Sequence, residues 1–238
     1  MLVLTSSDSL LRRIFPNEQA QFIPKNDDFP AFPFDDLKGE PQCYRIETTT
    51  SWQYAILEEY AGSSQFDRLR TWNGASVYAL ALDGRGFHGQ FARRWHTEPG
   101  NLFLCTAMPT QIEVRHAPKL QIIPTKAIIE ALRPRWHVEM GCRFRAPNDV
   151  VILREGSYAK IAGVLTEMRL ENGRIVQVRY GLGLNIDSAP VLTDPGHLPA
   201  AACGEFLDAT LPKSDLKRLI LNDILSFIAA HLDALKTP

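Results

Sequence analysis

The 238-residue chain has a balanced composition, with 45% hydrophobic and 22% charged residues and a formal net charge of −1. This length is enough for one well-filled core, and the near-zero charge gives no indication of a general nucleic-acid or anionic-membrane partner. No apolar run approaches the roughly 20 residues that span a bilayer, and the N-terminal stretch lacks the pattern of a signal peptide. We therefore expect a cytoplasmic protein that binds neither nucleic acid nor membrane.

The four cysteines and six histidines predict no metal site of their own. The sequence contains no C-x-x-C pair, and its histidines show no ligand spacing such as H-E-x-x-H. Isolated cysteines of this kind are typical of reduced thiols in the cytosol. A zinc site or a thioredoxin-like site is therefore not expected.

The first 42 residues read as a lead-in to the main domain. They hold a short apolar segment and a helix, followed by a proline-rich stretch. The segment is too short and too rich in proline for a winged-helix DNA-binding domain. We predict an N-terminal extension over residues 1–42 that packs on a domain formed by residues 43–238.

Two elements open the main domain. Alternating polarity over residues 44–49 predicts a strand. Residues 51–62 fit a helix that is capped by Thr50 or Ser51 and ends at Gly62.

Further along, strands outnumber helices. Strands are predicted over residues 76–82, 101–108, 143–146 and 150–155, and Thr125 is expected to cap a helix over residues 126–133. A long hairpin follows, with strands over residues 159–170 and 174–186 joined by the Asn172-Gly173 turn. An amphipathic helix over residues 214–235 ends the pattern. The pattern predicts an α+β fold with a mixed, largely antiparallel sheet flanked by helices.

The stretch from Gly84 to Phe103 contains G-x-G-x-x-G, the string of dinucleotide-binding loops. In those loops a helix follows the third glycine and directs its N–H groups at the pyrophosphate. Here only about six residues separate Gly89 from the next turn and strand, which is too short for a crossover helix. We therefore reject the dinucleotide interpretation.

The same loop is suited to an anionic ligand. Gly84 and Gly86 let the backbone approach a ligand closely, and the Arg85 guanidinium is a bidentate donor for a carboxylate or phosphate. Arg93 and Arg94 add positive charge, and Trp95 offers a flat ring for stacking. The alternative is a flexible surface loop whose arginines are only solvated.

Taken with later motifs, the chain resembles the catalytic domain of biotin protein ligases, in the biotin/lipoate ligase superfamily. That family carries S-T-N, G-R-G-x-x-G…W…P-x-G-x-L, K-W-P-N-D, K-x-x-G-x-L-x-E and G-x-G-x-N. The matches here occur in the same order: Thr50-Ser51-Trp52; Gly84-Arg85-Gly86 with Gly89, Trp95, Pro99, Gly100 and Leu102; Arg145 to Asp149; Lys160, Gly163, Leu165 and Glu167; and Gly181, Gly183 and Asn185.

The resemblance implies a fold like that of class II aminoacyl-tRNA synthetases and an enzyme that activates biotin. Members of the family form biotinyl-adenylate from biotin and ATP with Mg²⁺. They then transfer biotin to a lysine of a carrier domain such as the biotin carboxyl carrier protein. The family's small C-terminal β-barrel is not expected here, and a homodimer paired through sheet edges is an open alternative.

The resemblance also assigns roles to residues. It implies catalytic roles for Arg85 and Lys160. It implies substrate binding by Thr50, Ser51, Trp52, Gly84, Arg85, Gly86, Phe87, Lys160 and Gly163. It implies ATP binding by Arg93, Arg94, Trp95, Asn148, Asp149 and Asn185, with Asp149 as the magnesium contact.

Several positions depart from the family pattern and leave the substrate open. Phe87 and His88 follow G-R-G where a second arginine is common, and Arg145-Ala146 replaces lysine-tryptophan. Ala81 aligns with a polar residue, usually glutamine, that contacts biotin. The alternatives are therefore a lipoate or octanoate ligase or transferase, and a non-catalytic acyl-binding or regulatory module.

Overall fold

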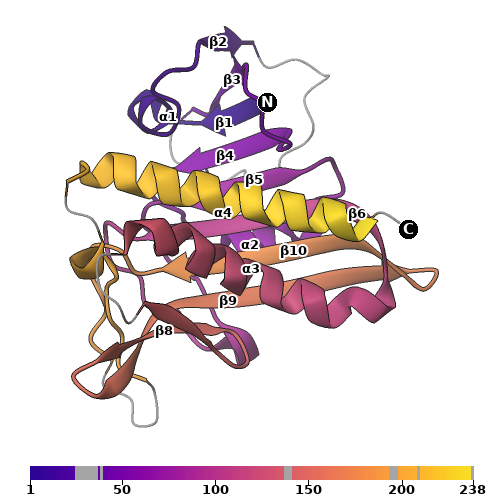
Figure 1. Ribbon diagram of the computed structural model, residues 1–238. Coiled ribbons are helices and arrows are strands. Elements are labelled where there is room, and N and C mark those ends of the chain that lie inside the picture. Colours follow the sequence, from indigo (N-terminus) through magenta and orange to yellow (C-terminus); the bar gives the residue numbers. More distant parts are fainter. Residues whose placement is uncertain (25–36, 38–39, 137–140, 193–197, 208–209, 237–238) are drawn as a thin grey trace.

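A computed structural model describes residues 1–24, 37, 40–136, 141–192, 198–207 and 210–236. Its centre is a ten-stranded sheet in the order β2-β3-β1-β4-β5-β6-β10-β9-β8-β7 (Figure 1). The strands are β1 (Leu2–Thr5), β2 (Ala20–Ile23), β3 (Gln42–Ile46), β4 (Tyr54–Glu58), β5 (Val77–Ala81), β6 (Leu102–Glu113), β7 (Cys142–Arg145), β8 (Asp149–Arg154), β9 (Ser157–Glu171) and β10 (Arg174–Leu184). The helices are α1 (Asp8–Ile14), α2 (Gln65–Arg68), α3 (Ala117–Leu132) and α4 (Lys213–Lys236).

The two faces of the sheet are covered differently. Helices α3 and α4 cross one face (Figure 1), and α4 buries Leu216, Ile220, Ile224, Ile228 and Leu232 in the larger core. The short helix α2 belongs to a second core, which holds residues of β4, β5 and β6. The β1–β4 and β4–β5 pairs are parallel and the other pairs are antiparallel. This arrangement confirms the mixed, largely antiparallel sheet.

The N-terminal region contributes strands to this sheet. Strand β1 lies between β3 and β4, and β2 forms the edge beyond β3. The first turn of α1 is capped by Ser7, whose hydroxyl accepts the N–H of Leu10 at 3.1 Å. Part of the proline-rich stretch, residues 25–36, lies outside the described residues. The division at residue 42 stays a prediction.

The prediction of a helix over residues 51–62 is wrong. This segment forms strand β4, whose Ala55, Ile56 and Leu57 are each 0% exposed. A strand that is buried on both faces carries a continuous apolar run, because neither set of alternating side chains meets water. Such a run lacks the alternation that identifies a half-buried strand, so its sequence is also compatible with a helix.

The start of α3 also differs from the prediction. The helix begins at Ala117, so Thr125 is a buried interior residue and not a cap. Pro124 lies inside this helix, although proline is normally excluded from a helix interior. A helix that starts after Pro124 is therefore what the local sequence predicts. The end before Pro134 and the hairpin of β9 and β10 are confirmed. No helix in the described ranges combines the length and the apolarity needed to cross a membrane.

Replacing Trp52 with phenylalanine tests its place in the core. Trp52 is 2% exposed, donates its indole N–H to the carbonyl of Leu225 at 3.2 Å and packs edge-on against Tyr78. Trp52→Phe should lower the free energy of unfolding by about 1–3 kcal/mol, because it removes buried volume and one hydrogen bond. Urea denaturation followed by circular dichroism measures the change. Unaltered stability with weaker ligand binding would instead favour the binding role that the resemblance implies.

Candidate functional site

A cavity of about 640 Å³ opens on the α2 side of the sheet. This volume lies in the range of small-molecule sites. Nine of the residues expected from the sequence line it: Phe87, Arg93, Arg94, Trp95, Asn148, Asp149, Lys160, Gly163 and Asn185. They come from the glycine loop after β5, from the start of β8, and from β9 and the end of β10.

The register of the sheet explains how distant segments meet at this cavity. One row of directly opposed residues crosses seven strands: Glu58, Ala81, Phe103, Gly183, Gly163, Asp149 and Arg145. Opposed residues of neighbouring strands point to the same face. The part of the row from Phe103 to Arg145 lines the cavity and forms its floor, with two adjacent glycines in the middle and the Asp149 carboxylate beside them.

The indole of Trp95 lies on the two glycines. A Cβ atom added to Gly163 would come within 2.7 Å of the ring, and one added to Gly183 would also come within 2.7 Å. Real Cβ contacts are not this short, so any side chain at either position would displace the ring. Two glycines paired across β9 and β10 thus create the space that Trp95 fills.

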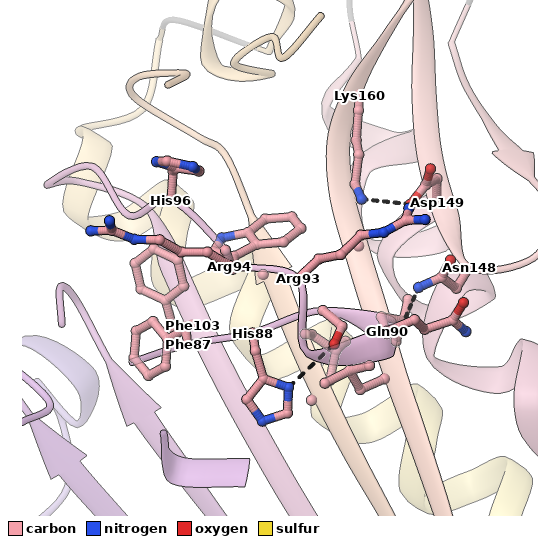
Figure 2. Close-up of a pocket in the computed structure, with 18 of the residues that line it drawn as sticks. Phe87, His88, Gln90, Arg93, Arg94, His96, Phe103, Asn148, Asp149 and Lys160 are labelled. Carbon is pink, nitrogen blue, oxygen red and sulfur yellow. Dashed lines mark hydrogen bonds and ion pairs between the residues drawn. The ribbon is translucent and has the colours of Figure 1, made fainter. Parts of the chain in front are cut away.

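Lys160 extends over the same part of the floor. Its ammonium group lies 2.6 Å from Oδ1 of Asp149 and 5.0 Å from the centre of the Trp95 ring. Asn148, next to Asp149, is held in place because its side-chain amide donates to the carbonyl of Val164 at 2.7 Å. The Lys160 side chain is 27% exposed and Asp149 is 14% exposed, so the pair is accessible from the cavity yet only partly hydrated. Figure 2 shows the pair on one side of the pocket.

The glycine loop is held by backbone contacts at both ends. The N–H of Arg85 donates to the carbonyl of Ala61 at 3.0 Å, and Gly86 has φ +74°, a conformation that glycine adopts without strain. Further on, Trp95 donates its N–H to the carbonyl of Phe87 at 2.9 Å, which closes residues 87–95 into a small hairpin. The exposed Phe91, at its far end, has φ 56°.

The arginines of this loop occupy different places. Arg93 and Arg94 line the cavity and are exposed at its rim, and Figure 2 shows Arg93 on the side of the pocket that holds Lys160 and Asp149. Arg85 does not line the cavity. Its guanidinium is exposed and donates from Nε to the carbonyl of Gly62 at 3.0 Å. The structure therefore brings Arg93, Arg94 and Lys160 to one cavity and leaves Arg85 outside it.

The segment Thr50-Ser51-Trp52 precedes β4 and lies away from the cavity. The row of opposed residues that leads to the floor begins at Glu58, at the other end of this strand, and the four-residue step from Tyr54 to Glu58 spans about 13 Å. Thr50 and Ser51 are exposed, and Trp52 is in the core. Gly84 and Gly86 shape the loop but are not among the lining residues.

A buried arginine, paired with a half-exposed glutamate, lies behind one wall of the cavity. Phe66 lines the cavity and contacts β10 at Gly181, where an added Cβ would meet its ring at 2.9 Å. The Arg179 guanidinium lies 4.3 Å from the centre of the Phe66 ring and forms an ion pair with Glu167. Burial lowers the pKa of Arg179. Sequence reasoning did not single out Phe66 or Arg179, because a charged residue inside a strand carries no local signal of burial.

A family model confirms the relationship that the motifs predict. The biotin/lipoate A/B protein ligase family matches residues 63–185, just over half of the chain. The chain belongs to the biotin/lipoate A/B protein ligase family. The matched region contains the glycine loop, β8, β9 and β10, and so almost the whole cavity floor.

Individual relatives agree with this placement. The bifunctional ligase/repressor BirA of Bacillus subtilis is 26% identical over 126 residues, which is 50% of this chain and 37% of that protein. BirA of Bacillus spizizenii is 26% identical over 174 residues, covering 69% of this chain and 52% of that protein. The chain thus spans between about a third and a half of the length of these relatives.

Solved structures show the same fold. The biotin protein ligase from Aquifex aeolicus in complex with biotin and ATP matches with a TM-score of 0.56 and 21% identity, over 78% of this chain and 72% of that chain. The biotin protein ligase from Leishmania major in complex with biotin gives a TM-score of 0.53 and 19% identity, over 77% and 81% of the two chains. At these identities the likeness establishes the fold of the ligase domain.

A second match to the family's S-T-N pattern was missed in the sequence. Ser63-Ser64-Gln65 begins the matched region and stands at the start of α2. Ser64 lines the cavity, and the loop passes it closely, since a Cβ at Gly86 would lie 3.6 Å from its backbone nitrogen. The signal is the Ser-Ser-Gln string itself, which directly follows Gly62 and so lies just beyond the helix predicted over residues 51–62.

The pH dependence of stability tests whether the thiol of Cys105, in the cavity wall, is buried. Burial raises the pKa of Cys105 from 9.0 to about 12. Above pH 9 the unfolded chain therefore loses this proton while the folded protein keeps it, so the thiol's contribution to stability is complete below pH 9 and falls between pH 9 and 12. Cys105→Ala lacks this contribution at every pH.

We expect the stability difference between wild type and Cys105→Ala to shrink by about 1 kcal/mol between pH 8 and pH 10. Chemical denaturation at both values measures the difference. A difference that stays constant would show that the thiol is hydrated in the folded protein.

Proposed function

We propose that this protein is an ATP-dependent ligase of the biotin protein ligase type. It would join the carboxylate of biotin to AMP and pass the acyl group to a lysine of a carrier domain. The observation that carries the proposal is the juxtaposition of Lys160 and Asp149 with the glycine loop in one cavity of the family's fold. Biotin and ATP are named for the Aquifex aeolicus ligase of that fold, which supports the choice of substrates.

In the first step an oxygen of the acid's carboxylate attacks the α-phosphorus of ATP. The bond from that phosphorus to the bridging oxygen breaks, and pyrophosphate leaves. Both reactants are anionic, so fixed cations must offset their repulsion and the charge that grows in the transition state. Lys160 would meet the carboxylate and the α-phosphate, and Arg93 and Arg94 at the rim would bind the remaining phosphates. Arg85 would take part only if its guanidinium left the carbonyl of Gly62.

Magnesium is compatible with this site. The described residues contain no cluster of three or more metal-ligating side chains. Magnesium in nucleotide sites is often held by one or two carboxylates, with phosphates and water as the other ligands. Asp149 would supply that carboxylate, and the ion would neutralise phosphate charge.

In the second step the neutral amine of the acceptor lysine attacks the acyl carbon, and AMP leaves. The mixed anhydride must be kept from water until then. The hairpin of residues 87–95 borders the cavity and would cover the adenylate. The four cysteines are free, as in a reducing compartment, and the cytoplasmic location stays a prediction.

A second candidate is a ligase for lipoate or octanoate, and one group of contacts favours it. Phe87 stacks on Phe103 with ring centres 5.0 Å apart, and both pack with Ala61 and Ala81. The two rings line the cavity, and Ala81 is buried with them at the position where relatives are expected to place a glutamine beside biotin. An apolar acyl chain would bury its surface there without leaving a polar group unpaired.

Pyrophosphate release distinguishes these candidates. Purified protein with ATP and Mg²⁺ should release pyrophosphate when one of biotin, lipoate or octanoate is added. The acid that gives the highest kcat/KM identifies the substrate. Binding of an acid without release would support a non-catalytic module and would contradict a ligase.

Lys160→Ala should lower kcat/KM for pyrophosphate release by about 100-fold or more, since it removes a fixed charge from the reacting groups. Lys126→Ala is the matched control, because Lys126 is exposed on α3 and does not line the cavity. The control should keep wild-type rates. Equal rates in Lys160→Ala and Lys126→Ala would remove Lys160 from the mechanism.

A further inference from the structure

The ring of Trp95 and the ammonium group of Lys160 occupy one small space above Gly163. A Cβ added to this glycine would lie 2.7 Å from Cζ3 of Trp95 and 3.0 Å from Nζ of Lys160. The ring and the ammonium group arrive from two different segments, the glycine loop and β9. Their positions are therefore interdependent, because movement of one changes the space left to the other.

Packing fixes the ring without a side-chain hydrogen bond. The indole N–H is buried and has no hydrogen-bond partner within the described part of the chain. The ring is held by flat contact with Gly163 and Gly183, and by the backbone bond from Trp95 to Phe87. Its place thus depends on how the loop lies on the floor.

Lys160 needs more than its ion pair to be fixed. A lysine side chain has a flexible four-carbon stem, and one carboxylate contact leaves several arrangements open. The Asp149 oxygen at 2.6 Å holds the ammonium group on one side. The electron-rich ring of Trp95, centred 5.0 Å away, attracts the same charge and limits the remaining freedom.

We propose that Trp95 is a positioning residue for Lys160, through which the glycine loop controls the lysine. When the loop lies on the floor, the ring and Asp149 together fix the ammonium group for the reaction. When the loop lifts, the ring leaves and Lys160 is no longer oriented. This inference rests on the proposed function of Lys160, and it replaces the nucleotide-binding role expected for Trp95.

Two substitutions separate the charge–ring contact from simple filling of space. Trp95→Phe keeps an aromatic face, and Trp95→Leu removes it. Trp95→Leu should lower kcat for pyrophosphate release by about 10- to 100-fold with little change in the KM for ATP, because misplacement of a catalytic group mainly affects the reacting state. Trp95→Phe should recover most of the rate. Equal kcat in both variants, or a raised KM for ATP alone, would overturn the proposal.

ATP affinity, measured by calorimetry without the acid, gives a second readout. If Trp95 acts through Lys160, Trp95→Leu should change ATP affinity less than about twofold both in the wild type and in a Lys160→Met background, because the ring then makes no contact of its own with the nucleotide. The same loss in both backgrounds would show that Trp95 contacts the nucleotide directly. A wild-type protein that binds ATP but releases no pyrophosphate would refute the ligase function, and this cycle would still decide the role of Trp95.

The glycines supply a matched pair of variants. Gly183→Ala directs a methyl group at Trp95 at 2.7 Å, and Gly181→Ala, two residues earlier on the same face, directs one at Phe66 at 2.9 Å. Adding Trp95→Leu to Gly183→Ala should cost little further activity. Adding Trp95→Leu to Gly181→Ala should lower activity by the product of the fold losses of the two single variants. Multiplied losses in both pairs would contradict the proposal, and thermal melting confirms that each variant is folded.

Discussion

The absence of side chains at Gly163 and Gly183 is the constraint on which the site depends. These residues face each other across β9 and β10 in the middle of the cavity floor. Any Cβ there would occupy the volume that now holds the Trp95 ring and the ammonium group of Lys160. The loop, the lysine and the carboxylate of Asp149 meet because the two glycines leave the sheet open to close approach here.

The charges around this point follow a gradient of burial. Asp149 is more deeply placed than Lys160, and the arginines of the loop are exposed at the rim. A partly buried lysine interacts more strongly with an anionic ligand than an exposed arginine does, because water screens it less. Under the proposed function, attraction of a charged substrate would fall to the rim and its final orientation to the floor.

Sequence patterns predicted the long hairpin, the last helix and nine of the residues that line the cavity, because glycine spacing and alternation are local properties. They failed at β4, where burial on both faces removes the alternation. They also placed Trp52 at the site, although it packs beneath α4, and they passed over Ser64. The Arg85 guanidinium donates to the carbonyl of Gly62 on a neighbouring loop. A contact of this kind cannot be predicted from the sequence.

The insertion of β1 between β3 and β4 has a consequence for engineering and assembly. This strand supplies hydrogen bonds to both neighbours, so it connects the outer strands β2 and β3 to the rest of the sheet. A truncation that removed residues 2–5 would leave β4 as a bare edge, open to pairing with other chains. Shortened versions of this protein should therefore retain the first strand if they are to stay monodisperse.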